Sequence, residues 1–114
     1  GEISFGTGEI GENMELPAEF PADILPLLDD ARIYHVNTND ANKAIGIVFL
    51  SEKSFAEAVA FYKEVMQNGK VNMENEDNGI YIAAGSKGDY AVSISITTSD
   101  NKTNILLDAT PKSN

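Results

Sequence analysis

The single histidine, His35, is the residue on which a nucleophilic active site would have to be built. A Ser-His-Asp triad also needs a serine held in a sharp turn, such as the Gly-x-Ser-x-Gly motif. The sequence has no such motif. His35 instead falls in a predicted strand, where it shares one face with Ile33 and Asn37. We therefore interpret His35 as a residue of the sheet surface rather than as a catalytic base.

Residues 74–79 (ENEDNG) imitate the first half of an EF-hand calcium loop, with oxygen-bearing side chains at alternate positions and a glycine at the sixth. The twelfth position must carry a bidentate carboxylate, but it is Gly85 here, and no pair of helices is predicted to flank the loop. The ligands therefore fall short of the six or more that calcium requires. A solvated hairpin loop is predicted, and weak, millimolar calcium association stays open as an alternative.

Two further short motifs are interpreted as turns. Residues 101–103 (NKT) fit the N-glycosylation sequon, and residues 85–88 (GSKG) lack the spacing of a phosphate-binding loop and precede a strand. The chain has no cysteine, which excludes disulfides, thiolate catalysis and cysteine-bound zinc. We assign no catalytic, cofactor-binding or metal-binding residue, and we expect neither an enzyme nor a cofactor.

Aromatic side chains are the remaining candidates for a functional surface. Tyr62 and Tyr90 occupy positions that the hydrophobic pattern predicts to be buried, and core packing is their expected role. Phe61 lies off the buried stripe of its helix, so it could cover a sheet edge or meet a partner.

The elements that must position these residues begin with one helix. Ser54 followed by Glu57 forms a capping box, and Gly69 is typical of a helix end. Between them, apolar residues recur at spacings of three and four: Phe55, Ala58, Val59, Tyr62, Val65 and Met66. This spacing predicts an amphipathic helix that buries one face against a flat partner.

An antiparallel sheet is predicted to be that partner. Short apolar or alternating runs predict strands over residues 33–36, 44–50, 71–73, 80–84, 90–97 and 105–109. Segments rich in Gly, Asn and Asp separate the last four runs and favour tight hairpins. The predicted fold class is therefore α+β, one amphipathic helix packed on an antiparallel sheet in the order β-β-α-β-β-β-β.

The chain is expected to form one domain over residues 17–110. Residues 1–16 are glycine-rich and acidic without a regular period, which predicts a flexible leader. Residues 111–114 are expected to form a disordered tail. Because the chain starts with Gly and no signal peptide is visible, we expect that a targeting segment has been trimmed away.

Charge limits the classes of partner. The chain has 8 Lys and Arg against 18 Asp and Glu, a net charge of -10. Such a surface repels phosphate backbones and anionic lipids, so nucleic acid is not an expected partner. No apolar run is long enough to cross a bilayer, and direct membrane insertion of this segment is not expected.

Three stretches together resemble a known kind of domain: residues 21–33 (PADILPLLDDARI), 54–63 (SFAEAVAFYK) and 88–94 (GDYAVSI). They are similar to uncharacterised exported lipoprotein domains of Gram-positive bacteria. The resemblance implies an extracytoplasmic protein whose leader tethers the domain to a lipid-modified cysteine upstream. It implies no catalytic activity.

Two hypotheses about function follow. The first is a non-enzymatic exported or cell-surface module that binds a protein or a cell-envelope ligand through the sheet or its loops. The alternative is a small-molecule carrier or an enzyme with a pocket between helix and sheet, because the same fold can serve both. The absence of Cys, of Trp and of clustered His favours the first hypothesis.

Overall fold

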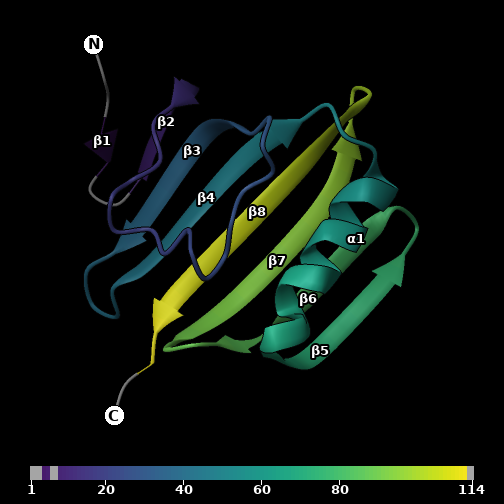
Figure 1. Cartoon of the computed structure of the whole chain (residues 1–114). Coiled ribbons are helices and arrows are strands. Elements are labelled where there is room, and N and C mark those ends of the chain that lie inside the picture. Colours follow the sequence, from purple (N-terminus) through teal and green to yellow (C-terminus); the bar gives the residue numbers. More distant parts are fainter. Residues whose placement is uncertain (1–3, 6–7, 113–114) are drawn as a thin grey trace.

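One antiparallel sheet forms the body of the molecule in a computed structural model that describes residues 4–5 and 8–112, with side chains from Met14 onward (Figure 1). Its strands are β1 (Ser4–Phe5), β2 (Gly8–Met14), β3 (Arg32–Asn39), β4 (Ala44–Ser51), β5 (Lys70–Asp77), β6 (Ile80–Lys87), β7 (Tyr90–Ser99) and β8 (Lys102–Pro111). They lie in the order β1-β2-β3-β4-β8-β7-β6-β5. The last four strands form a meander that returns β8 to the side of β4, which confirms the predicted α+β fold class and element order.

Tight hairpins produce this meander. The β5–β6 turn has Asn78 and Gly79 at φ of 52° and 77°, and the β7–β8 turn has Asp100 and Asn101 at 52° and 65°. Two consecutive residues at positive φ are typical of the type I′ turn, whose twist matches that of the flanking strands. The glycine and asparagine clusters predicted these turns because such residues tolerate this conformation.

The helix α1 (Phe55–Val65) packs on one face of the sheet and continues into a 3-10 turn (Met66–Asn68). Both bonds of the predicted capping box are present: the Glu57 amide donates to Ser54 Oγ, and the Ser54 amide donates to Glu57 Oε1, each at 3.1 Å. The buried stripe consists of Ala58, Val59, Tyr62 and Met66. None of the helices in the described part of the chain is long and apolar enough to span a membrane.

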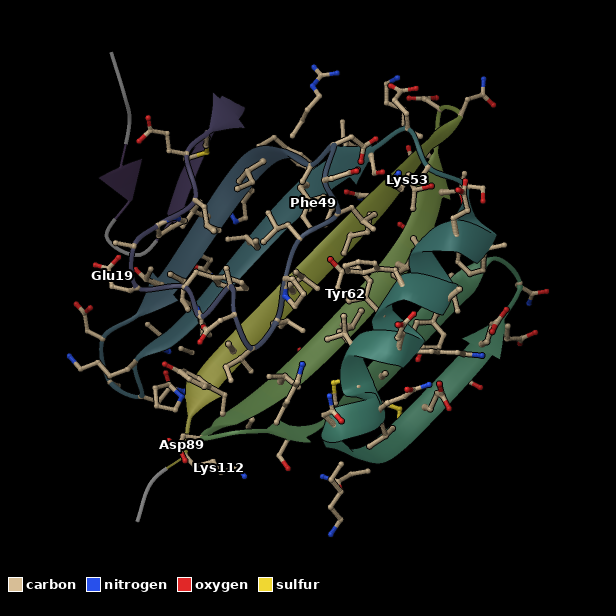
Figure 2. All side chains as sticks on the ribbon, viewed as in Figure 1. Glu19, Phe49, Lys53, Tyr62, Asp89 and Lys112 are labelled. Atoms are coloured by element: carbon tan, nitrogen blue, oxygen red, sulfur yellow. The ribbon has the colours of Figure 1, made fainter. Side chains whose placement is uncertain are left out.

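Residues 15–31, which we name the proline-rich segment, cover the other half of the same face. Figure 1 shows this segment crossing β3, β4 and β8 on the side where α1 lies over β6 and β7. Its side chains Phe20, Leu25 and Leu28 are buried in the hydrophobic core. Tyr62 Oη of α1 donates a hydrogen bond of 2.8 Å to the Pro26 carbonyl, which ties the helix to the segment (Figure 2). Helix and segment together therefore form one covering layer.

The structure corrects several predicted boundaries. Glu74 and Glu76 belong to β5 rather than to a hairpin loop, and Gly85 belongs to β6 rather than to a turn. Gly85 lies so close to β5 that a Cβ atom there would be 1.8 Å from the Lys70 carbonyl oxygen. The strand propensity of the residues alone did not predict these two extensions, because pairing with a neighbouring strand stabilises them.

The two ends of the chain also differ from expectation. The leader, for which no regular structure was predicted, contains β1 and β2, and β2 pairs with β3. Its flexibility stays a prediction. At the other end, Pro111 belongs to β8 and the Lys112 amide donates to the Asp89 carbonyl. Residues 113–114 of the predicted tail lie outside the described residues.

Candidate functional site

The two faces of the sheet have opposite surroundings. Between the inner face and the covering layer, Phe49 of β4, Tyr81 of β6 and Tyr62 of α1 are at most 1% exposed and belong to one hydrophobic core. No buried side-chain nitrogen or oxygen among the described residues lacks a hydrogen-bond partner. The inner face therefore has the properties of a packed core.

The opposite face, which we name the outer face, is exposed on the four strands β4, β6, β7 and β8. Burial alternates along these strands, so their outward-pointing residues are known. They are Ala44, Gly46, Val48 and Leu50 on β4; Ile80, Ile82, Ala84 and Ser86 on β6; Ala91, Ser93, Ser95, Thr97 and Ser99 on β7; and Lys102, Asn104, Leu106, Asp108 and Thr110 on β8. Within residues 14–112, no helix or loop covers them, as the placement of both covering elements on the inner side shows (Figure 2).

The composition of the outer face is unusual for this chain. Asp108 and Lys102, at opposite ends of β8, are its two charged residues, although the protein has 26 charged residues distributed over 114 positions. Three large apolar side chains stand open to solvent: Ile80 at 44%, Leu106 at 41% and Ile82 at 36% of their full exposure. Depletion of charge around exposed apolar side chains is the compositional mark of a protein interface. We therefore take the outer face as the candidate functional site.

Asp108 lies at one end of this face, above the small residue Gly46. A Cβ atom on Gly46 would be 3.4 Å from Asp108 Oδ2, so the glycine leaves room for the carboxylate. Partial burial raises the pKa of the Asp108 carboxyl, while a hydrogen bond with Thr110 acts in the opposite direction. A hollow of about 260 Å³ beside it is lined by the amides of Asn37, Asn39 and Asn42 among other residues. The described residues that line this hollow offer hydrogen-bonding groups, and none of them is a cation.

The other end of the outer face is organised by a bulge in β3. The pairing register shifts between Ile33 and His35, so Ile33 pairs with the inner residue Phe49 whereas His35 pairs with the outer residue Val48. The prediction that Ile33 and His35 share a face is therefore wrong, because the extra residue inverts the alternation. That extra residue, Tyr34, donates its hydroxyl to Asn104 Oδ1 at 2.8 Å. The aromatic side chains of Tyr34 and His35 therefore both lie on the outer side of the sheet.

A second hollow, which we name the helix groove, lies between the proline-rich segment and α1 and has a volume of about 500 Å³. Its lining residues are Leu27, Leu28, Asp29, Lys53, Glu57, Ala60, Phe61 and Glu64. Phe61 packs edge-on against Tyr62 with ring centroids 4.9 Å apart and is half-buried, as the sequence suggested. Its lining combines four apolar residues with three carboxylates and one cation, Lys53, which pairs with Asp29 at 3.3 Å.

A hydrogen-bonded cluster near the groove holds the proline-rich segment on the sheet. Asp30 accepts from the Ser51 hydroxyl at 2.7 Å and from the Glu52 amide at 2.9 Å. Burial opposes ionisation of Asp30, but these two bonds and the charge of Lys53 outweigh it and lower the pKa. Both oxygens of the carboxylate are occupied by these structural bonds, so the cluster serves to anchor the segment.

The acidic residues of the calcium-like motif are dispersed by strand alternation. Glu74 and Glu76 pair with inner residues of β6, whereas Asp77 pairs with the outer residue Ile80. Glu74 accepts from the Tyr81 hydroxyl at 2.6 Å, and Glu76 lies 3.7 Å from Lys63 Nζ. Burial and the bond to Glu74 raise the pKa of Tyr81. The carboxylates thus have protein partners, and residues 14–112 contain no cluster of three acidic or histidine side chains fit to hold a metal.

The two turn motifs also have structural explanations. Asn101 of the sequon occupies the β7–β8 turn, as predicted, but Thr103 is buried and donates its hydroxyl to the Lys53 carbonyl.

The outer face could not be identified from the sequence, because its residues are distributed over four strands. The alternation of Ser93 and Ser95 with isoleucine was visible, yet nothing in the sequence showed that the strands beside β7 have few charged residues on that side.

Comparison with known proteins gives one match. A family model described as START domain-like matches residues 30–104, about two thirds of the chain. Comparison with curated proteins and with solved structures gives no significant match. The matched region runs from the Asp30 anchor through α1 into β8, so it includes the helix and the central strands that build both faces. This chain therefore belongs to a START domain-like family.

Proposed function

We propose that this protein is a non-enzymatic binding module that engages a protein partner through the outer face of its sheet. The observation that carries this proposal is the nearly uncharged and partly apolar composition of the outer face in a chain with a net charge of -10. A merely solvated face would be expected to have its share of the 18 acidic residues.

The chemistry of the outer face fits a protein surface. Ile82 and Leu106 supply exposed apolar area. The hydroxyl of Ser95, which lies between them, and that of Ser93 in the neighbouring row can form hydrogen bonds with a partner. Interfaces combine apolar contact with about one hydrogen bond per 100–200 Å². The side chains also sit on strands rather than loops, so little ordering entropy opposes binding.

An exported setting is part of the proposal. It is supported by the resemblance of residues 21–33, 54–63 and 88–94 to exported lipoprotein domains of Gram-positive bacteria, with the leader as a tether and a protein or cell-envelope component as the partner. The first thirty codons of the full gene test this setting. A signal sequence that ends in a lipid-modified cysteine supports it, and a start codon directly before Gly1 contradicts it.

The binding surface is tested with two double variants of equal charge change. Ile82→Lys with Leu106→Lys alters the outer face, and Ala56→Lys with Gln67→Lys alters exposed positions on the helical side. Proteins of the source organism that the wild-type domain retains are identified, purified and titrated against each variant by calorimetry. We expect the outer-face pair to weaken the dissociation constant at least about tenfold and the helical pair to leave it unchanged. The reverse pattern would contradict the proposal.

The helix groove favours a second candidate function, carriage of a small amphiphilic cation. Its apolar lining includes Leu27 and Phe61. The carboxylates of Glu57 and Glu64 also line it, while the one cation of the lining, Lys53, pairs with Asp29. This places the pocket beside the helix rather than between helix and sheet, where the earlier alternative expected it. Titration of small quaternary amines by NMR tests it. Saturable shifts confined to the groove support carriage, and an unshifted spectrum removes it.

A further inference from the structure

We propose that the partner of the outer face is a second copy of this chain, packed sheet against sheet about a twofold axis that runs between β7 and β8. This inference rests on the proposed function, because it requires the outer face to be a binding surface. It adds the identity of the partner and the register of the complex.

The axis follows from the register of the central strands. Ser95 of β7 pairs directly with Leu106 of β8, so a small and a large outward side chain stand next to each other. Consider a twofold axis that lies in the plane between the two packed sheets, parallel to the strands and above the line midway between β7 and β8. Rotation about this axis places β8 of one copy over β7 of the other. Leu106 of each copy then lies over Ser95 of its mate. A large side chain faces a small one at both symmetric positions, as interdigitated sheet packing requires.

The same operation matches the strands farther from the axis. It places β6 over β4, because these strands lie on either side of the β7–β8 pair. Along the row that contains Ser95 and Leu106, the β6 residue is Ile82 and the β4 residue is Val48. The operation therefore stacks Ile82 of one copy on Val48 of the other, twice per dimer. An apolar side chain meets an apolar side chain on both flanks.

The strands that flank these four, β3 and β5, add opposite charges. Arg32 of β3 pairs with Leu50, and Asp77 of β5 pairs with Ile80. Leu50 and Ile80 lie in the next row along the sheet. The same twofold rotation therefore brings Arg32 of one copy toward Asp77 of the other. Sheet twist offsets aligned sheets by about 30° and weakens these distant matches, so the pairs beside the axis define the interface.

Charge restricts self-association to this face. Two copies that each have a net charge of -10 repel one another wherever carboxylates meet. The molecule is 22 Å thick, which exceeds the screening length of about 8 Å at physiological salt. Carboxylates on the helical side, such as Glu57 and Glu64, are therefore screened from a mate bound at the outer face. The four central strands bring one carboxylate per copy into the interface, that of Asp108, which the rotation places over Ser93 of the mate. Contact through the helical side would bring them together.

The outer side is also large enough. The molecule measures 40 by 36 Å across its two longer dimensions. A standard interface buries about 800 Å² on each partner, which corresponds to a square with a side of about 28 Å. The four central strands and their neighbours provide a patch of this size.

Complementary charge variants test both the partner and the register. Ser95→Lys and Leu106→Glu each introduce an unpaired charge at the axis, and each alone is expected to be monomeric. When the two proteins are mixed, the new lysine of one copy faces the new glutamate of the other, while the unchanged Leu106 and Ser95 also face each other. We expect a heterodimer in sedimentation velocity at about 100 µM, a concentration suited to a micromolar interface.

Wild type and a control complete the experiment. Wild type is expected to dimerise with increasing concentration, and Ala56→Lys, a change at an exposed position of α1 outside the helix groove, is expected to dimerise equally. Circular dichroism and a melting curve verify that each variant is folded. If the wild type stays monomeric, the proposal that the partner is a second copy is wrong. The proposal that the outer face binds a protein is then still tested by the calorimetric titration of the double lysine variants. A dimer that survives Leu106→Glu, or a mixture of the two charge variants that stays monomeric, overturns the proposed register.

Discussion

The inner and outer faces of the sheet are made by the same strands, yet their residues follow different rules. On β7, Val92, Ile94 and Ile96 point inward and are buried, whereas Ser93 and Ser95 point outward. The inner face maximises burial under α1 and the proline-rich segment. The outer face combines small hydroxyl residues with exposed leucine and isoleucine. Substitutions on the inner face should therefore act on folding, and those on the outer face should act on binding.

The largest effect is expected from Ile94→Ala on the inner face. Ile94 is 1% exposed, and truncation leaves a cavity under the helix, which costs about 2–5 kcal/mol of unfolding free energy. Leu106→Ala on the outer face is the matched change and should cost less than about 1 kcal/mol in monomeric protein. Urea denaturation of dilute protein measures both. Equal losses of unfolding free energy in the two variants would show that another part of the same chain covers the outer face. The distinction between a buried inner face and an exposed outer face would then be wrong.

The next effect is expected from Tyr62→Phe, which tests whether the proline-rich segment belongs to the inner layer. The change removes the hydrogen bond to the Pro26 carbonyl and leaves that oxygen unpaired, at a cost of about 1–3 kcal/mol. Thermal unfolding measures the loss. Limited proteolysis within residues 15–31 should accelerate in the variant, and an unchanged rate would mean that this bond does not hold the segment.

A smaller loss is expected from Ser54→Ala at the start of α1. The substitution removes the side-chain acceptor of the Glu57 amide and should cost about 1 kcal/mol. Ser93→Ala on the outer face is the control and should be nearly neutral in dilute protein. Chemical denaturation with an unchanged slope would assign the loss to stability alone. A neutral Ser54→Ala would mean that packing of the stripe, rather than the cap, determines where the helix begins.

The smallest effect is expected from Asp108→Asn, and it should depend on pH. Burial raises the pKa of Asp108 above its unfolded value, so the folded state binds this proton more tightly than the unfolded state. The stability contribution of Asp108 is therefore greatest below its unfolded pKa of about 3.9 and falls as pH rises through the folded pKa. The variant should gain a few tenths of a kcal/mol over wild type at pH 7 and nothing at pH 3. A gain at pH 3 alone would contradict this sign.

Prediction from sequence succeeded where the deciding interactions are local. The capping box of Ser54 and Glu57 requires contacts over three residues, and the hairpin at Asp100 and Asn101 requires only two residues that tolerate positive φ. Failures occurred where a partner strand decided the outcome. The bulge at Tyr34 and the extension of β5 through Glu76 both depend on pairing with residues distant in sequence, which local propensity does not record.

The sequence by itself determined the order of the elements, the buried stripe of α1 and the period-two alternation of β7, because side-chain direction follows from backbone periodicity. Only the tertiary structure decided which strands lie side by side. That arrangement aligns Ser95 with Leu106 and places Ile82 and Val48 on either side of them in one row. A face with so few charges exists only after four strands have paired, because each strand alone contributes only a few of its residues.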